Sequence, residues 1–341
     1  MTDRDAAAPL AGFGMIRSLA GQPLGQAAPA DEFLHPPAAS GHYSATETSY
    51  FGFNVPDQAL NGEIYVWFHP VLRIMSASVY LWRGFHASTL SCEYVNHFHY
   101  LPYPDRDIGD YAIDEIGLRI RVLEPLRAVQ IEFRDEQRDV DFSLLSRAIM
   151  PPAVRPGGFH FTQAMRTTGT LDLLGTRYTI DGWFSRDRSW GQERRETSRL
   201  IPPFTWMVGV VDDEFAFHAL AFDSADSGPA WLSRYRTIGQ DNLVWGYVWR
   251  RGEIRPLASA WKSTRRAADG LSPTGFSLVL RDMAGEAHEI EGEVRARMPW
   301  QTWQNMNVYF CQTRWQCAQG VGWGDAQDIQ QNDFVHRFCR R

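Results

Sequence analysis

The chain has 341 residues, of which 44% are hydrophobic and 22% charged, and its formal net charge is −6. This balance is typical of a folded globular protein and argues against nucleic acid as the main partner, because phosphate binding needs a basic surface. We expect no membrane span, because no run of 18 uncharged apolar residues occurs, and no secretory signal, because the N-terminus has acidic residues and no apolar stretch. The four cysteines form no C-x-x-C pair. We therefore expect a cytoplasmic protein with reduced thiols.

The sequence is rich in aromatic residues, with 13 Trp, 20 Phe and 12 Tyr. Aromatic side chains fill the cores of β-proteins, and they also line apolar ligand cavities. Core packing is the simpler explanation for each residue taken singly. Their number favours an enlarged apolar cavity and a hydrophobic small molecule as the partner.

The predicted elements begin after an irregular arm over residues 1–45, which is rich in Ala, Gly and Pro. Residues 62–84, 88–103 and 111–135 then mix β-branched and aromatic residues at alternate positions, which predicts strands. In the third of these segments, apolar residues at 118, 120 and 122 alternate with two arginines. This pattern is typical of a sheet with one wet face.

The second half of the chain reads as further hairpins, starting with residues 202–223 and a turn at Asp212-Asp213. Turn signals recur across nearly 300 residues and no long helical period appears, which predicts an all-β sandwich or barrel. The string YLWRG at 80–84 returns as YVWRRG at 247–252. This echo fits two similar barrels in tandem, divided either at the Pro-rich loop 151–158 or at 194–204.

One short segment combines these features: DGWFSRDRSWG, residues 181–191. In a strand, Ser185, Asp187 and Ser189 would share one face, and the two intervening arginines the other. If the first face points into an aromatic cavity, burial makes the Asp187 carboxyl a usable proton donor near neutral pH. The alternative is an aspartate that pairs with its neighbouring arginines in a turn.

No nucleotide, dinucleotide, metalloprotease or serine-hydrolase motif occurs in the chain, so we expect no cofactor. His97 and His99 lie at i and i+2 and could clamp a metal ion from one face of a strand. Since no acidic or cysteine partner recurs near them, we favour polar lining and expect no metal site.

The 181–191 segment resembles the D-H-x-W-G signature of the hydroxyneurosporene synthase (carotenoid 1,2-hydratase)-like family. Residues 50–70, 168–182 and the GVGWGD string at 320–325 are similar to it as well, and the resemblance covers residues ~45 to 335. It implies two lipocalin-like domains, which we place at 46–195 and 196–341. The family includes hydratases and intramolecular Diels–Alder catalysts. The expected fold is therefore all-β: two tandem lipocalin-like antiparallel β-barrels packed side by side, after an irregular arm at 1–45.

The resemblance also assigns roles to residues of the motif. Asp187 matches the acid that protonates an isoprenoid double bond, while Trp190 and Gly191 match the structural end of the signature. Arg188 replaces the family's histidine, and Ser185 replaces an aromatic residue that stabilises a cation. Phe184 or Trp183 is placed at a neighbouring position to supply that aromatic surface instead.

Other candidate site residues come from the strands. His218 in FAFHALAF is a candidate base if it is partly buried and titrates near neutral pH. His69 precedes a proline at a strand interruption, where a barrel mouth forms. The aromatic residues expected near the cavity are Trp67, Tyr94, Tyr100, Trp206, Trp245 and Trp323.

Two hypotheses follow. The first is a cofactor-independent enzyme, a hydro-lyase or an isomerase/cyclase, that acts on an isoprenoid, steroid-like or polyketide-like molecule at the interface of the two barrels, with Asp187 as the acid. The second is a lipocalin-like carrier or sensor of a hydrophobic metabolite without turnover. The two differ in whether the carboxyl of Asp187 faces the ligand.

Overall fold

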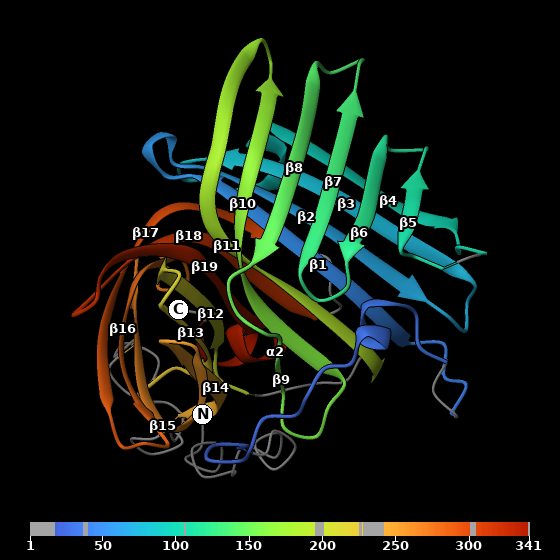
Figure 1. Ribbon diagram of the computed structural model, residues 1–341. Helices are drawn as coiled ribbons and strands as arrows, with labels where there is room; N and C mark the ends of the chain where they lie inside the picture. Colours follow the sequence, from blue (N-terminus) through green and yellow to red (C-terminus); the bar gives the residue numbers. More distant parts are fainter. Residues whose placement is uncertain are drawn as a thin grey trace. The chain divides into compact units, whose positions relative to one another are not determined.

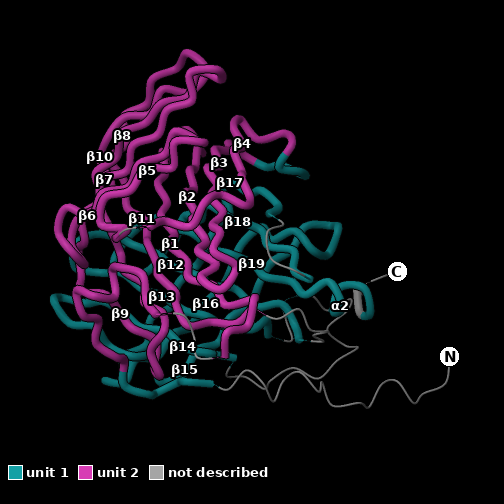
Figure 2. The backbone as a smooth tube through the Cα atoms, turned by 90° about the vertical axis from the view of Figure 1, so that its right-hand side faces the viewer, with its two compact units in different colours: residues 1–23, 85–89, 196–341 teal, residues 24–84, 90–195 magenta. Residues whose placement is uncertain are grey.

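The computed structural model describes residues 18–36, 40–105, 107–194, 201–224, 227, 242–300 and 305–339. The expected arm is therefore described only from residue 18, and the expected domain boundary at 195/196 lies outside the described residues. The chain divides into two compact units (Figure 2). Unit 1 comprises residues 1–23, 85–89 and 196–341, and unit 2 comprises residues 24–84 and 90–195.

Unit 2 is an antiparallel sheet in the order β4-β3-β2-β1-β11-β10-β8-β7-β6-β5, with β9 added beside β10. Its strands are β1 (Ala45–Val55), β2 (Leu60–His69), β3 (Ile74–Arg83), β4 (Tyr94–Pro102), β5 (Asp110–Ile113), β6 (Leu118–Glu124), β7 (Ala128–Asp135), β8 (Val140–Ala148), β9 (Ala153–Val154), β10 (His160–Leu173) and β11 (Thr176–Glu193). Short 3₁₀ turns lie at η3 (Pro29–Glu32), η4 (Pro56–Gln58) and η5 (Thr89–Ser91).

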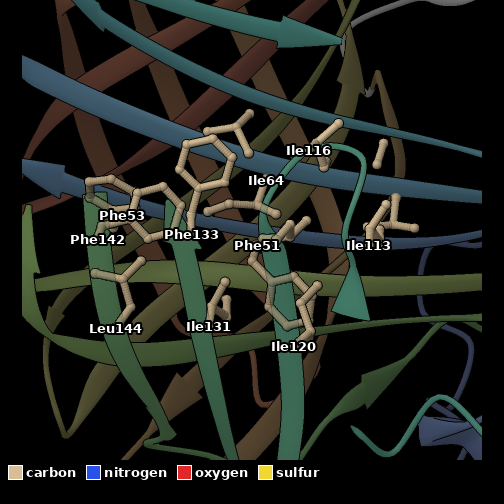
Figure 3. Packing of buried hydrophobic residues seen from close by; sticks show 14 of the residues in the cluster. Phe51, Phe53, Ile64, Ile113, Ile116, Ile120, Ile131, Phe133, Phe142 and Leu144 are labelled. Carbon is tan, nitrogen blue, oxygen red and sulfur yellow. The ribbon is translucent and has the colours of Figure 1, made fainter. Parts of the chain in front are cut away.

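The sheet of unit 2 curls over itself, so that β7, β8 and β10 cross in front of β1 to β4 (Figure 1). Its core lies between these two layers, where Phe51 and Phe53 of β1 meet Phe133 and Phe142 of β7 and β8 (Figure 3). The Phe53 and Phe142 rings are 5.6 Å apart. Burial of apolar area of this kind drives the curl.

Unit 1 is a closed eight-stranded antiparallel barrel, in which β19 pairs with β12. Its strands are β12 (Phe204–Asp212), β13 (Phe215–Phe222), β14 (Leu243–Arg250), β15 (Glu253–Arg266), β16 (Pro273–Asp282), β17 (Ala287–Trp300), β18 (Met306–Cys317) and β19 (Gly320–Gln331), followed by the short helical turns α2 (Asn332–Phe334) and η7 (Val335–Cys339). No helix among the described residues is long and apolar enough to cross a membrane.

Local sequence explains both the strands and their turns. In β17, buried and exposed residues alternate along nearly its whole length, as period-2 patterning requires. At the hairpin predicted around Asp212-Asp213, the carboxylate of Asp212 accepts the backbone N–H groups of Glu214 and Phe215 at 2.8 and 2.9 Å. The all-β, lipocalin-like architecture is confirmed. One unit closes into a barrel through hydrogen bonds, whereas the other remains a curled sheet.

Candidate functional site

Strand β11 carries the DGWFSRDRSWG segment and lies between β1 and β10. Asp187 pairs with Tyr50 on one side and Thr162 on the other, while Arg186 pairs with Phe51 of the core. Paired residues of antiparallel strands point to the same face, so the alternation places Asp187 and the arginines on opposite faces.

On the arginine face, Arg186 forms a buried ion pair with Glu32 of η3. Its Nη2 lies 3.0 Å from the carboxylate, its Nη1 makes a second contact, and its Nε donates to Gln163 at 2.9 Å. Both charged side chains are 98% buried or more. Burial opposes ionisation of Glu32, but the charge and hydrogen bonds of Arg186 outweigh it and hold the pKa of Glu32 below its ordinary value.

Arg188 ties the same N-terminal segment to the sheet. It donates to the Glu47 carboxylate at 3.2 Å and to the Phe33 carbonyl at 2.7 Å. His35 lies 3.3 Å from Glu47 and stacks on Trp190, with ring centroids 4.4 Å apart and an interplanar angle of 4°. The two arginines thus pair with Glu32 and Glu47, on the face away from Asp187, so the geometry does not support the alternative in which Asp187 is their partner.

On the Asp187 face of the sheet, the pairing of β11, β1, β2, β3 and β4 places one polar side chain from each strand in a row. Asp187 of β11 pairs with Tyr50, Tyr50 with Tyr65, Tyr65 with Ser78, and Ser78 with His97 of β4. Neighbouring strands lie ~4.8 Å apart, so each side chain stands next to the following one. A carboxyl, two phenols, a hydroxyl and an imidazole form a continuous row, which we call the Asp187 row.

The carboxyl end of the Asp187 row is buried among aromatic rings. Asp187 is 8% exposed. The Tyr50 and Tyr65 rings meet edge to face at 5.2 Å, and Trp67 lies 4.3 Å from Tyr65. Burial and the nearby charge of Asp187 both raise the pKa of Tyr65, so its hydroxyl stays protonated close to the carboxyl group.

The imidazole end of the row is also held in a defined form. His97 stacks on Trp67 at 5.4 Å and lies 2.8 Å from the Tyr80 hydroxyl through Nδ1. Burial and the neighbouring His99 lower the pKa of His97 to about 4, so the ring is neutral at pH 7. The His97 and His99 rings lie 4.3 Å apart, as their spacing predicts.

Phe184 joins this face because Gly52 leaves room for its ring. A Cβ atom at Gly52 would lie 1.9 Å from Cε1 of Phe184, which no side chain could occupy. The Phe184 and Tyr50 rings are 6.4 Å apart. Half-buried His69 ends β2 near Thr46, two residues beyond Trp67 on the same face, and burial lowers its pKa, with Arg194 and His99 adding to the effect.

Two aromatic residues expected near a cavity, Tyr94 and Tyr100, lie away from the Asp187 row. Tyr94 belongs to the apolar core on the opposite face of its sheet, where its hydroxyl donates to Asp135 at 2.7 Å and Arg138 lies over its ring. Tyr100 is 81% exposed and has a φ of 61°. It follows an irregularity in the pairing of β3 with β4, which turns its side chain toward solvent.

A second aromatic cluster lies on the barrel of unit 1. His218 pairs with Tyr247, and Trp206 pairs with Leu220, which pairs with Trp245. Their strand neighbours Met207 and Ala219 belong to the barrel core, so the cluster is on the outer face of the wall. The His218 ring lies 4.5 Å from Trp245, 5.1 Å from Trp206 and 5.6 Å from Tyr247.

His218 differs from the base expected from the sequence. It is fully buried, and its Nδ1 lies 3.0 Å from the Met207 carbonyl oxygen. Burial lowers its pKa to about 3, against the opposing effect of that hydrogen bond. The imidazole is therefore neutral and does not titrate near neutral pH, because no charge among the described residues compensates its desolvation.

Trp323 lies on the outer face of the barrel as well, but further along the wall. It pairs with Val210 and Arg314 and is half-buried. The residues that sequence reasoning missed are Tyr50, Tyr65 and Tyr247. Tyr65 and Tyr247 each stand two positions from a tryptophan that was singled out, which is the spacing of one strand face.

The barrel of unit 1 also contains a buried charge network beside its apolar core. Lys262 and Arg266 of β15 both pair with Asp223, and Arg266 also contacts Asp328 of β19 at 2.8 Å. Although burial opposes its ionisation, the two cations keep the pKa of Asp223 below its ordinary value. The charges compensate one another, which is the structural form of a buried network.

One cluster in unit 1 has the composition of a metal site. Ligand atoms of Asp282, Glu286 and His288 lie within 4.8 Å of one another. Arg250 pairs with Glu286, and Arg255 lies 3.5 Å from both carboxylates. Two guanidinium groups already supply the positive charge there, so the cluster is best described as an ion-pair network.

The fold has solved relatives, although no curated protein matches the sequence. Kievitone hydratase from Nectria haematococca aligns at 12% identity with a TM-score of 0.54, over 93% of this chain and 97% of that one. A protein assigned as AttH from Nitrosomonas europaea aligns at 14% identity and a TM-score of 0.54, over 88% and 97%. CghA in complex with Sch210972 aligns at 13% identity and a TM-score of 0.54, over 88% and 94%.

At these identities the solved structures show a shared fold and no more. The family follows from the sequence itself. One family model matches residues 28–331, which is most of the chain. This protein belongs to the family described as Domain of unknown function (DUF7064).

Proposed function

We propose that this protein is a cofactor-independent enzyme that acts on an apolar small molecule by acid-catalysed hydration, isomerisation or cyclisation of a double bond. The observation that carries the proposal is the position of Asp187, buried among Tyr50 and Tyr65 on the face away from the arginines. The ionised Asp187 carboxylate raises the pKa of Tyr65, whereas burial among aromatic rings favours the neutral form of a carboxyl group, which is the form that donates a proton.

In the proposed reaction, the Asp187 carboxyl transfers its proton to one carbon of the double bond, and the other carbon becomes cationic. The ring faces of Tyr65, Trp67 and Phe184 stabilise that cation. Water then attacks the cation and returns a proton to the Asp187 carboxylate, which gives the hydrated product. Loss of a neighbouring C–H proton to the Asp187 carboxylate gives an isomer instead. Attack by a second double bond closes a ring and moves the cation, which then loses a proton to the same carboxylate.

The comparisons support the proposal at the level of fold. Kievitone hydratase is named for a hydration, and CghA was solved with the small molecule Sch210972, so the same fold serves a hydratase and a small-molecule complex. Fold alone does not specify chemistry, which is why Asp187 is the residue to test. We assign the substrate to the apolar isoprenoid, steroid-like or polyketide-like compounds, with a cytoplasmic setting.

The test is proton transfer from solvent. Wild type and Asp187→Asn are incubated in D₂O with kievitone, geranylgeraniol and pregnenolone, and mass spectra are recorded for water addition and for deuterium bound to carbon. Asp141→Asn is the matched control, since Asp141 is exposed on β8. We expect label with the wild type and the control, and a loss of at least about 100-fold with Asp187→Asn.

Label that enters equally with Asp187→Asn would remove Asp187 from the mechanism. If tryptophan fluorescence shows that a probe binds and no probe takes up label or water, the protein is a carrier or sensor of hydrophobic metabolites, and the enzymatic proposal fails.

A further inference from the structure

The His218 ring has a fixed tautomer. Its Nδ1 lies 3.0 Å from the Met207 carbonyl oxygen. A carbonyl oxygen only accepts hydrogen bonds, so Nδ1 carries the proton. A neutral imidazole has one N–H group, and Nε2 therefore presents a lone pair at the opposite end of the ring.

That lone pair has no partner among the described residues. The Nε2 atom is buried and makes no hydrogen bond, in a side chain that is 0% exposed. Buried polar groups in folded proteins are almost always hydrogen-bonded, because an acceptor removed from water without a donor is unfavourable. An acceptor left open in this way indicates that a donor arrives from elsewhere.

The surroundings of His218 select the kind of molecule that carries the donor. Trp206, Trp245 and Tyr247 place aromatic rings within 4.5 to 5.6 Å of the imidazole. Such rings pack against flat apolar ligands. A carboxylate or phosphate would meet a lone pair instead of a donor, and burial of an ammonium group would carry a large desolvation penalty.

We propose that His218 is the hydrogen-bond acceptor for a phenolic or similar hydroxyl group of a flat apolar ligand that packs on Trp206, Trp245 and Tyr247. The hydroxyl donates to Nε2 while the Met207 carbonyl holds the other end of the ring. This is a binding role, and it does not rest on the proposed catalysis by Asp187. Loss of deuterium transfer in Asp187→Asn would leave it untouched, and a carrier would use it equally well.

The experiment compares two probes that differ only in the donor, 2-naphthol and 2-methoxynaphthalene, by isothermal titration calorimetry. We expect the wild type to prefer 2-naphthol by about 10- to 100-fold, because only the hydroxyl satisfies Nε2. Equal affinities overturn the proposal, and so does the absence of binding of both probes up to their solubility limits.

Two substitutions separate the ends of the imidazole. His218→Asn keeps a donor for the Met207 carbonyl and removes the distal acceptor, so we expect the preference for the hydroxyl to disappear. His218→Gln places an amide oxygen near the position of Nε2 and should retain most of it. The reverse order of the two variants overturns the proposal.

A second measurement needs no substitution. Nitrogen NMR of wild-type protein with ¹⁵N-labelled histidine should show one ring protonated at Nδ1 with a bare Nε2. The Nε2 signal should shift with 2-naphthol and stay in place with 2-methoxynaphthalene. A proton on Nε2 instead of Nδ1, or equal shifts with both probes, also overturns the proposal.

Discussion

The two units bury their charges in different places. In unit 1, Arg266 joins two carboxylates inside a barrel that hydrogen bonds already close. In unit 2, Arg186 and Arg188 of β11 reach out of the sheet to the segment that carries Glu32 and Phe33. Phe33 packs on the apolar core of the curled sheet. A closed barrel thus uses buried charge to join its own strands, whereas the open sheet uses it to hold a covering segment.

The comparison also separates the structural polar groups from the candidate functional ones. Each network pairs cations with carboxylates, and both candidate site residues lie on the opposite faces of the same walls. Asp187 lies on the opposite face of β11 from Arg186 and Arg188. His218 likewise points away from the barrel interior, where Lys262 lies. Compensated charge stabilises the fold, while the aromatic faces carry the groups that we propose for catalysis and ligand binding.

We expect the largest effect from a substitution that breaks the buried charge network of the closed barrel. Arg266→Met removes one of the two cations that pair with Asp223 and deprives Asp328 of its guanidinium partner, so we expect a loss of about 3–5 kcal/mol in the free energy of unfolding. Urea denaturation measures it. The control is Arg265→Met, whose half-exposed pair with Glu291 is expected to contribute less than about 1 kcal/mol. Equal losses in the two variants would show that the barrel network is not structural.

The network of the open sheet is expected to give a similar or smaller loss, because the segment it holds can move away. Arg186→Met removes the cation that is hydrogen-bonded to buried Glu32 and leaves only the more distant charge of Arg188, so it should cost about 3 kcal/mol. Because the uncompensated charge causes the loss, the double variant Arg186→Met/Glu32→Gln should recover part of it. Limited proteolysis should cut near residues 29–35 in the single variant first. A double variant no more stable than the single one would contradict this explanation.

The last effect depends on pH and concerns a buried group that is neutral. The pKa of His218 is lowered to about 3 from its ordinary 6.5. Between these values the unfolded chain binds a proton that the folded chain does not. The free energy of unfolding of the wild type therefore falls as the pH drops from ~6.5 toward 3, by up to ~1.4 kcal/mol per pH unit, and above pH ~6.5 no stability is lost in this way. His218→Asn lacks this term. Its stability should therefore approach that of the wild type as the pH falls from 6 to 4, and a constant difference would rule out the buried neutral imidazole.

The sequence by itself determined the class of fold and the two faces of the 181–191 segment. Period-2 alternation in residues 118–122 and 185–190 follows from the geometry of a single strand, so it needs no knowledge of the neighbours. The same rule placed His97 beside His99. Where both faces are buried, as in β1, alternation vanishes and the sequence gives no register.

Only the tertiary structure decided which strands meet. The Asp187 row exists because β1 lies between β2 and β11. Strands β1 and β11 are more than 120 residues apart in the chain, and no local pattern specifies that they pair. Tyr94 and Tyr100 lie away from the Asp187 row, although both are aromatic. The direction of each side chain is set by the strand face on which it lies and by the irregular pairing of β3 with β4. The state of His218 was likewise outside the reach of the sequence, because a pKa depends on burial and on partners, and both are properties of the folded chain.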